Sequence, residues 1–281
     1  MQSQSVKKSK LGFSLNCRGQ LIDLSKPLVM GILNVTPDSF SDGGRYDQEK
    51  NAIVRAEEMM FEGAAIIDIG AQSTRPNAEK IDAKEEIHRL GSVIKSIKKI
   101  NPKVLISLDT FYAETVKFGF DEGIDLVNDI SGGQYDPNLL KTVAETGLPY
   151  VLMHVNATYD EMHHKIISED LLVHLNRYFF EKAAVLQALG IKDIILDPGF
   201  GFGKTVVQNQ ELIEYFGLVG FGEFPLLAGI SRKSFIYKPL NKTPLEIAEE
   251  TQNLHLKLIK NGAQILRVHD VAPTVALLKN N

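Results

Sequence analysis

Hydrophobic residues gather in eight short runs along the chain, and most of these runs are continuously apolar rather than alternating. They cover residues 27–35, 64–70, 103–110, 124–131, 149–155, 193–199, 225–231 and 264–270. Continuous apolar runs of this length are typical of parallel strands that are covered on both faces. We therefore predict eight parallel strands.

Each run is followed by a segment in which apolar residues recur with the period of a helix. These segments are 47–61, 84–100, 112–121, 138–145, 170–189, 210–216, 244–260 and 272–279. Parallel strands need a crossover connection, which a helix supplies. The pattern thus predicts eight consecutive βα units.

A polar residue lies at or near the end of every predicted strand. These residues are Asn34, Asp68, Asp109, Asn128, His154, Asp197, Ser231 and Arg267. They recur about every 33 residues, roughly the length of one βα unit. A doubly wound open sheet has the same alternation, but polar groups at all eight strand ends favour a ring around one mouth. We predict a (β/α)8 TIM barrel.

Two further short strands are predicted before the barrel, around the turn residues Arg18 and Gly19. We expect an N-terminal β-hairpin that closes the bottom of the barrel. The expected organisation is a tail and hairpin at residues 1–26 and one barrel domain at residues 27–281. A length of 281 residues fits a single barrel of this kind.

Composition narrows the class of protein. With 44% hydrophobic and 23% charged residues, the chain can bury a sizeable core. A net charge of −4 argues against nucleic acid or anionic lipid as a partner. The sequence has no run of about 18 apolar residues, so no membrane span is predicted. The only cysteine, Cys17, cannot form an intramolecular disulfide, which indicates a reducing compartment and a cytoplasmic location.

The strand ends indicate the chemistry of a ligand. In a barrel, Asp68, Asp109, Asn128 and Asp197 would converge on one pocket, where their oxygens can accept N–H groups. Lys233 can donate to a carbonyl or a ring nitrogen. A flat heterocycle with a guanidine-like edge, as in a pterin or guanine, satisfies this set better than a sugar or an acyl group.

Basic residues follow the last two strands, in Ser231 to Ser234 and Arg267 to Asp270. The loops after strands seven and eight are the usual phosphate site of a barrel. Arginine and histidine donors suit an anion there, and the sequence therefore predicts an anion site next to the heterocycle.

Other patterns exclude some sites. The glycine-rich segment 199–205 has three residues between Gly199 and Gly203, whereas a nucleotide-binding P-loop has four. We expect instead a tight loop in which Phe200 or Phe202 walls the ligand. A single cysteine and the lack of an HExxH motif argue against zinc. Asn34 is a plausible oxygen donor to magnesium when substrate phosphates supply other ligands.

Six motifs occur together and in order from about Pro27 to the end of the chain. They are MGILNVTPDSFSDGG, STRP, NDISGG, LDPGFGFGKT, SRKS and RVHDV. On these motifs the chain resembles the dihydropteroate synthase family. The resemblance implies a pterin-binding barrel transferase of folate synthesis that joins 4-aminobenzoate to 7,8-dihydropterin-6-ylmethyl diphosphate. It also implies a magnesium-dependent cytosolic homodimer and a sulfonamide target.

The resemblance assigns roles to individual residues, with Asn34 as the magnesium ligand. The implied contacts to the pterin diphosphate are Thr74, Asp109, Asn128, Asp197, Lys233, Arg267, Val268 and His269. The implied aminobenzoate side comprises Ser73, Thr74, Pro76, Phe202 and Ser234. Catalytic roles are implied for Asp38, Arg75, Lys233, Arg267 and His269.

The chain departs from the family pattern in several places. Gln72 stands where the family often has Glu, and Asn77 where Gly commonly follows the proline. After the fifth strand, HVNATYDEM replaces a more usual HMRGTPxTM, so residues 156–159 lack the expected glycine and proline. In the seventh helix, EETQNLHLKLIKNGA replaces a small-residue pattern. These differences concern loop shape and helix packing, and with them substrate range and sulfonamide response.

Two other functions share part of this pattern. A pterin-dependent methyltransferase domain would use Asp109, Asn128 and Asp197 in the same way, but its ligand has no diphosphate for SRKS and RVHD to bind. A pterin-binding paralogue that has lost synthesis is the second alternative, and the altered 156–159 loop is its main support. Release of diphosphate from both substrates would separate these functions.

Overall fold

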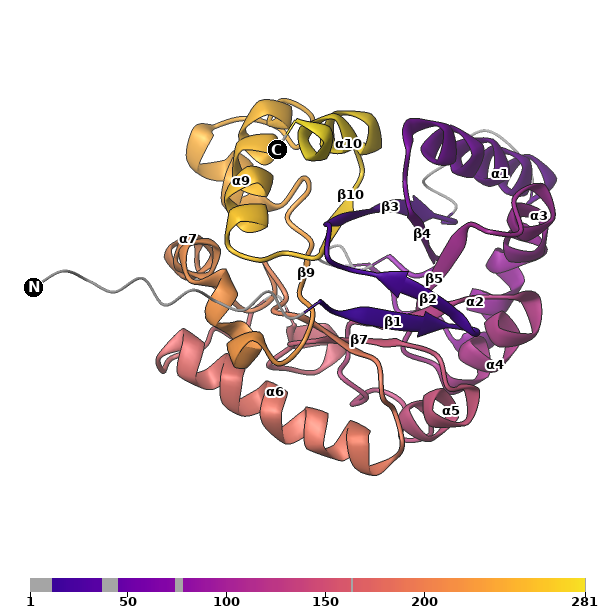
Figure 1. Cartoon of the computed structure of the whole chain (residues 1–281), viewed down its shortest axis with the longest axis horizontal. Helices are drawn as coiled ribbons and strands as arrows, with labels where there is room; N and C mark the ends of the chain where they lie inside the picture. Colours follow the sequence, from indigo (N-terminus) through magenta and orange to yellow (C-terminus); the bar gives the residue numbers. More distant parts are fainter. Residues whose placement is uncertain (1–11, 37–44, 74–77, 163, 281) are drawn as a thin grey trace, which may run out of the picture.

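A computed structural model describes residues 12–36, 45–73, 78–162 and 164–280, and it confirms the predicted barrel. Parallel strands form a nearly closed ring, and helices surround it (Figure 1). The strands are β3 (Leu28–Asn34), β4 (Ile66–Gly70), β5 (Leu105–Asp109), β6 (Leu126–Asp129), β7 (Tyr150–Met153), β8 (Ile194–Asp197), β9 (Leu227–Ala228) and β10 (Ile265–Val268). They are ordered β8-β7-β6-β5-β4-β3-β10-β9, as a barrel of consecutive βα units requires.

The ring is weakest between β8 and β9. There the pairing is a single bridge between Leu196 and Leu226, with the Leu196 amide donating to the Pro225 carbonyl at 2.9 Å. Strand β9 has two residues, although a strand over 225–231 was predicted. Residues 229 and 230 are no longer part of the strand, and a turn follows at Ser231 and Arg232, where Arg232 has a φ of 60°.

A helix lies in each of the eight predicted segments, although several bounds differ and some short helices are additional. They are α1 (Arg45–Glu62), α2 (Ala83–Leu90), α3 (Val93–Ile100), α4 (Ala113–Glu122), α5 (Leu139–Thr146), η2 (Tyr159–Glu161), α6 (Leu171–Ala188), α7 (Val206–Glu214), η3 (Phe216–Gly222), α8 (Ser234–Tyr237), η4 (Lys238–Leu240), α9 (Ala248–Lys260) and α10 (Val271–Lys279). The predicted helix 84–100 is broken at Gly91, whose φ of 49° ends α2. Helix α7 begins earlier than predicted because Thr205 and Gln208 form a capping box.

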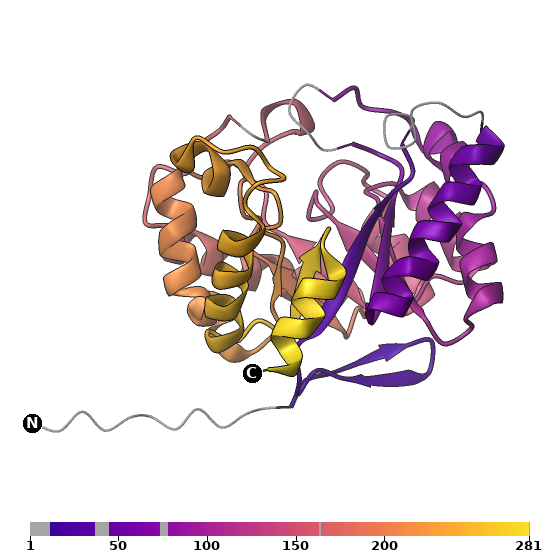
Figure 2. The same ribbon diagram turned by 90° about the horizontal axis from the view of Figure 1, so that it is seen from above.

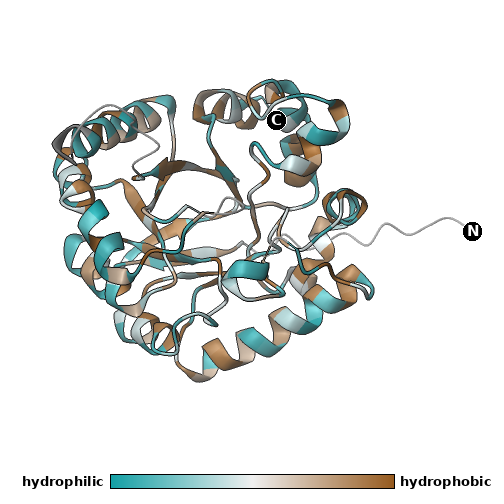
Figure 3. Cartoon of the chain, turned by 180° about the vertical axis from the view of Figure 1, so that it is seen from behind, coloured by the Kyte–Doolittle hydropathy of each residue, from teal (hydrophilic) through white to brown (hydrophobic). Residues whose placement is uncertain are grey.

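Hydropathy follows this architecture. Apolar colour dominates the strands, whereas the surrounding helices mix apolar and polar residues along their length (Figure 3). Within the described ranges, no helix combines the length and the apolar character needed to cross a bilayer.

The bottom of the barrel is filled by one apolar side chain from each strand. These are Met30, Ile66, Leu105, Leu126, Val151, Ile195, Leu227 and Ile265. Leu15 and Cys17 of the hairpin pack in the same cluster. Figure 2 shows the hairpin across this end of the barrel, so that the strands' lower ends do not face water.

The hairpin itself has the predicted geometry, with β1 (Ser14–Cys17) antiparallel to β2 (Gln20–Asp23). Its turn residues Arg18 and Gly19 both have positive φ, 54° and 88°, as a type I′ turn requires. The Arg18 guanidinium donates to the carbonyls of Phe120 and Ile124, both at 3.1 Å, beside the end of α4. The turn therefore fastens the hairpin to the barrel.

We expect Leu15→Ala to lower the stability of the whole barrel. Leu15 is 2% exposed at the centre of the bottom cluster, and truncation of a buried leucine costs about 2–5 kcal/mol. Leu21→Ala is the matched control, because Leu21 lies in the same hairpin but is 73% exposed. Urea unfolding should show a lower midpoint only for Leu15→Ala. Equal midpoints for the two variants would mean that the hairpin does not contribute to the core.

Candidate functional site

Four neighbouring strands, β3 to β6, place one residue each at the same level near their carboxyl ends. Asn34 pairs with Gly70, Gly70 with Asp109, and Asp109 with Asn128. A Cβ on Gly70 would lie 3.2 Å from the Asp109 Cβ, so glycine leaves room for this carboxylate. The parallel register therefore places an amide, a carboxylate and a second amide on the same rim, as the sequence predicts.

Arg267 on β10 lies between two carboxylates at this rim. Its Nε donates to Asp68 Oδ2 at 2.6 Å, and its Nη2 donates to Asp109 Oδ2 at 2.6 Å. Asp68 also accepts from Ser107 Oγ and from Asn128 Nδ2, the latter at 3.1 Å. A guanidinium and two carboxylates are thus joined inside the barrel mouth, where they are partly shielded from water.

Burial and mutual attraction compete in this group. Burial raises the pKa of the Asp109 carboxyl to about 7, although Arg267 opposes the shift. Burial alone would lower the pKa of Arg267, but Asp68 and Asp109 raise it above its usual value. Arg267 therefore keeps its charge, whereas Asp109 is poised to respond to a ligand that donates or withholds hydrogen bonds.

Asp197 and Lys233 form the next part of the mouth. Asp197 ends β8, is buried, and accepts from the Gly199 amide at 2.8 Å. Burial raises its pKa, whereas the Gly199 amide, Lys233 and Arg267 lower it. Burial also lowers the pKa of Lys233 to about 8, and Arg267 adds to that shift. The Lys233 ammonium lies 4.2 Å from the centre of the Phe202 ring.

The loop after β8 is held by an internal lysine. Lys204 Nζ donates to the carbonyls of Gly199 and Phe202, both at 3.0 Å, and lies 3.2 Å from His154 Nδ1. Burial lowers the Lys204 pKa to about 7. Gly199 has a φ of 69°, and a Cβ there would lie 2.3 Å from the His154 carbonyl oxygen. The loop is therefore tight, as predicted, and Lys204 shapes it instead of binding a nucleotide.

The two phenylalanines of this loop differ. Phe200 is 1% exposed and stacks between Phe216 and Phe235, with ring centres 6.0 Å apart in both pairs. It therefore belongs to the core. Phe202 is also buried in this core, but its ring lies under the Lys233 ammonium and is the one that can wall a ligand.

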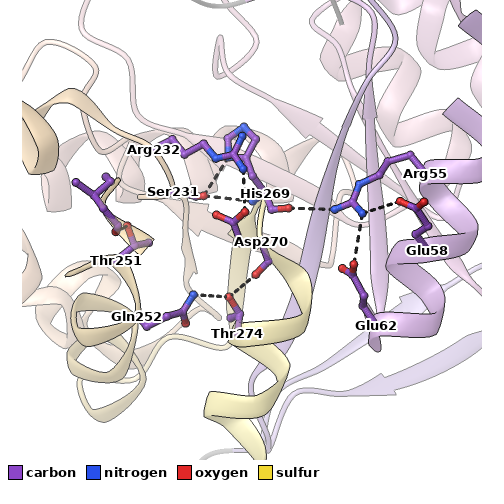
Figure 4. A network of polar contacts seen from close by, with 11 residues as sticks. Arg55, Glu58, Glu62, Ser231, Arg232, Thr251, Gln252, His269, Asp270 and Thr274 are labelled. Atoms are coloured by element: carbon purple, nitrogen blue, oxygen red, sulfur yellow. Dashed lines mark hydrogen bonds and ion pairs between the residues drawn. The ribbon is translucent and has the colours of Figure 1, made fainter. Parts of the chain in front are cut away.

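The predicted anion side is built by the loops after β9 and β10. The Ser231 hydroxyl accepts from the His269 amide at 3.2 Å and lies 3.0 Å from His269 Nδ1. A hydroxyl that donates to Nδ1 leaves the ring proton on Nε2, which can then donate to an anion. Arg232 pairs with Asp270 at 2.8 Å, and Arg55 reaches the His269 carbonyl at 3.4 Å (Figure 4). Arg232 thus braces the loop.

The remaining predicted residues have different outcomes. Val268 is 1% exposed in the core, so only its backbone is available to a ligand. Ser234 begins α8, and Ser73 follows β4; both are half-buried. Four predicted residues lie outside the described ranges, namely Asp38, Thr74, Arg75 and Pro76.

Asn34 is the predicted magnesium ligand. It is half-buried at the end of β3. Of the residues that the structure describes, no three His, Cys, Asp or Glu side chains are grouped as metal ligands would be. An amide oxygen such as that of Asn34 fits a hard cation that receives most of its ligands from water and a substrate.

Some functional residues were not identified as such from the sequence. The sequence places Asp68 with the ligand-facing acids, but it is 0% exposed and serves as the buried partner of Arg267. Lys204 lies in the glycine-rich segment 199–205, from which we expect only a tight loop. The glycines before Lys204 could have indicated its role. They predict a tight turn, and the carbonyl groups buried inside such a turn need a hydrogen-bond donor.

Comparisons with known proteins agree with this geometry. Residues 30–269 match the family model described as pterin binding enzyme. The dihydropteroate synthase of Escherichia coli (strain K12) is 40% identical over 267 residues, which cover 94% of each chain. That of Synechocystis is 41% identical over 254 residues, 89% of this chain and 88% of the relative.

Solved structures give the same result. The Yersinia pestis dihydropteroate synthase in a sulfonamide drug complex superposes with a TM-score of 0.89 at 39% identity, covering 95% of this chain and 98% of that one. The Xanthomonas albilineans dihydropteroate synthase with 4-aminobenzoic acid has a TM-score of 0.88 at 34% identity, covering 95% and 96%. The chain described here therefore belongs to the pterin-binding enzyme family, and the relatives that it matches over nearly its whole length are dihydropteroate synthases.

Proposed function

We propose that this chain condenses 7,8-dihydropterin-6-ylmethyl diphosphate with 4-aminobenzoate, giving 7,8-dihydropteroate and diphosphate. The observation that carries the proposal is the barrel mouth in which Asp109, Asp197, Lys233 and Arg267 interact, in a chain 40% identical to a dihydropteroate synthase. Neither the methyltransferase nor the non-catalytic alternative accounts as well for the basic loops after β9 and β10.

The charges of the mouth suit a pterin. Asp109 and Asp197 accept N–H groups from its guanidine-like edge, and Lys233 donates to its carbonyl or ring nitrogen. The Asn128 amide is oriented because its Nδ2 donates to Asp68 at 3.1 Å, so its oxygen is the acceptor left for the ligand. Each of these contacts replaces a hydrogen bond that the pterin would otherwise make to water.

The reaction breaks the bond between the methylene carbon and the diphosphate oxygen. The electron pair leaves with the diphosphate, and the dihydropterin delocalises the positive charge at the methylene carbon. Arg267 and His269 stabilise the charge of the leaving group from the β10 side. The arylamine nitrogen then bonds to the carbon and loses a proton, so no protein nucleophile is required.

Magnesium is the proposed cofactor. Asn34 would supply one oxygen ligand at the end of β3, and the diphosphate would supply others. The ion stabilises negative charge on the leaving diphosphate when it is bound.

The aminobenzoate side lies next to the pterin. Phe202 forms an apolar wall beside Lys233, Ser73 follows β4, and Ser234 begins α8 after β9. We propose that the second substrate binds there. Four residues outside the described ranges would also contribute to its binding, namely Asp38, Thr74, Arg75 and Pro76.

The purified protein should release diphosphate only when both substrates and magnesium are present, as measured by a coupled phosphate assay.

Asp197→Asn should weaken pterin diphosphate binding at least tenfold by calorimetry, because an amide replaces a charged acceptor while Gly199 keeps its hydrogen bond. Asp193→Asn is the control, since Asp193 precedes the same strand at its other end and accepts from the Asn16 amide. Diphosphate release without aminobenzoate, or equal binding by both variants, would contradict the assignment.

Chelation of magnesium should affect binding of the diphosphate part of the first substrate and not binding of its pterin part. We expect chelator to weaken the pterin diphosphate at least tenfold and to change the affinity for a pterin without phosphates less than twofold, because the ion contacts only the leaving group. Equal losses for both ligands in calorimetry would point to a structural metal instead.

We propose in addition that the protein is a cytoplasmic homodimer. Two exposed rings support an apolar contact surface, because Phe180 of α6 stacks on Phe221 of η3 and the two are 40% and 65% exposed. Phe221→Asp should halve the mass measured by light scattering, from twice the 31.2 kDa of the chain to one chain. Leu21→Asp, an exposed position on the hairpin, should leave the dimer intact. A wild-type protein that is monomeric at high concentration would overturn this proposal.

A further inference from the structure

Two departures from the family pattern meet in space. Gln72, just after β4, donates from Nε2 to the Tyr159 hydroxyl at 2.8 Å, although 87 residues separate them. Tyr159 lies in the altered loop after β7. Both side chains are 8% exposed. Each residue therefore provides the buried polar partner that the other needs.

The Gln72 amide also holds both ends of the segment that follows it. Its Nε2 lies 2.8 Å from the Ser73 carbonyl and 3.0 Å from the Glu79 carbonyl, and its Oε1 accepts from the Ile81 amide at 2.8 Å. The Tyr159 hydroxyl donates to the same Ser73 carbonyl at 2.9 Å. The backbone of Ser73 is thus fixed from two directions by one amide and one phenol.

Glutamine suits this position for a chemical reason. The Gln72 amide has two N–H groups, which the Tyr159 hydroxyl and the carbonyls of Ser73 and Glu79 share, whereas a glutamate carboxylate offers none at neutral pH. Tyr159 keeps its own proton, because burial raises its pKa to about 12. The contact is therefore insensitive to pH in the physiological range, and it depends on both of the unusual residues.

An aromatic floor supports the same stretch of chain. The Lys80 ammonium lies 5.2 to 5.7 Å from the ring centres of Phe111, Tyr112, Tyr135 and Tyr159. The Tyr112 hydroxyl donates to the Ile81 carbonyl at 2.6 Å. These rings come from the loops after β5, β6 and β7. Residues of three loops therefore contact Lys80 and Ile81, which follow β4.

We propose that Gln72 and Tyr159 are positioning residues for the second substrate, and that they act by fixing Ser73 on the aminobenzoate side of the mouth. This inference rests on the proposed function. Neither residue contacts the pterin acceptors Asp109 and Asp197 through any hydrogen bond of the described structure. Loss of the contact should therefore weaken aminobenzoate and leave the first substrate unaffected.

The test is a single hydroxyl deletion with a matched control. Tyr159→Phe keeps the ring in the floor and removes both of its hydrogen bonds. Tyr135→Phe removes a hydroxyl from the same floor, 6.2 Å away between ring centres, whose partner is the Ala157 carbonyl and not the residues after β4. We expect Tyr159→Phe to raise the KM for 4-aminobenzoate at least fivefold, and Tyr135→Phe to change it less than twofold.

Three further readouts separate positioning from simple loss of structure. The Kd for pterin diphosphate should change less than twofold in both variants. Gln72→Glu should raise the aminobenzoate KM at least as much as Tyr159→Phe does. The double variant Gln72→Glu with Tyr159→Phe should lose less than the sum of the two single losses, because each single change already removes the shared Gln72–Tyr159 hydrogen bond.

The outcomes are distinguishable. Equal KM values for Tyr159→Phe and Tyr135→Phe in an active enzyme would overturn the inference and leave the proposed function standing. An equal loss of affinity for both substrates would also overturn it, since the contact would then support the whole mouth. If Gln72→Glu does not fold, the two phenylalanine variants still decide. A wild-type protein that releases no diphosphate overturns the proposed function and this inference together.

Discussion

The site depends on one buried guanidinium that joins strands far apart in the sequence. Arg267 on β10 bonds to Asp68 on β4, 199 residues away, and to Asp109 on β5. Removal of one partner from such a buried pair costs about 3–5 kcal/mol, because the other charge is left uncompensated. Lys233 adds a second cation and Asp197 a third carboxylate, so three carboxylates face two cations in the mouth. A ligand edge rich in N–H groups corrects that imbalance.

Much of this arrangement is predictable because parallel strands impose it. Asn34, Asp109 and Asn128 lie at or next to the ends of β3, β5 and β6, and the register through Gly70 of β4 brings them to one level. The role of Asp68 could not be predicted in the same way. One apolar run does not reveal which of its polar residues faces an arginine from the last strand. Likewise, β9 ends at Ala228 and a left-handed turn follows at Arg232, a residue type that does not by itself predict a positive φ.

Departures from a family pattern are the least predictable part of the molecule. Considered one at a time, Gln72 and the loop that contains Tyr159 each look like the loss of a residue that the family usually has. Their contact at 2.8 Å shows that one substitution complements the other. Local sequence cannot show this, since the partners come from the second and fifth βα units. Lys204 is similar, because its carbonyl acceptors become apparent only when the glycine loop has closed around it.

The hairpin at the bottom has a consequence for the order of synthesis. Leu15 and Cys17 emerge first, yet their neighbours include Ile265 of the last strand. The N-terminal residues must therefore wait, exposed, until almost the entire polypeptide has been made. Contacts of such long sequence separation slow folding. The Cys17 thiol, whose pKa burial raises to about 12, is protected only in a finished ring. In the closed ring this thiol is therefore a poor nucleophile, because burial disfavours its charged form.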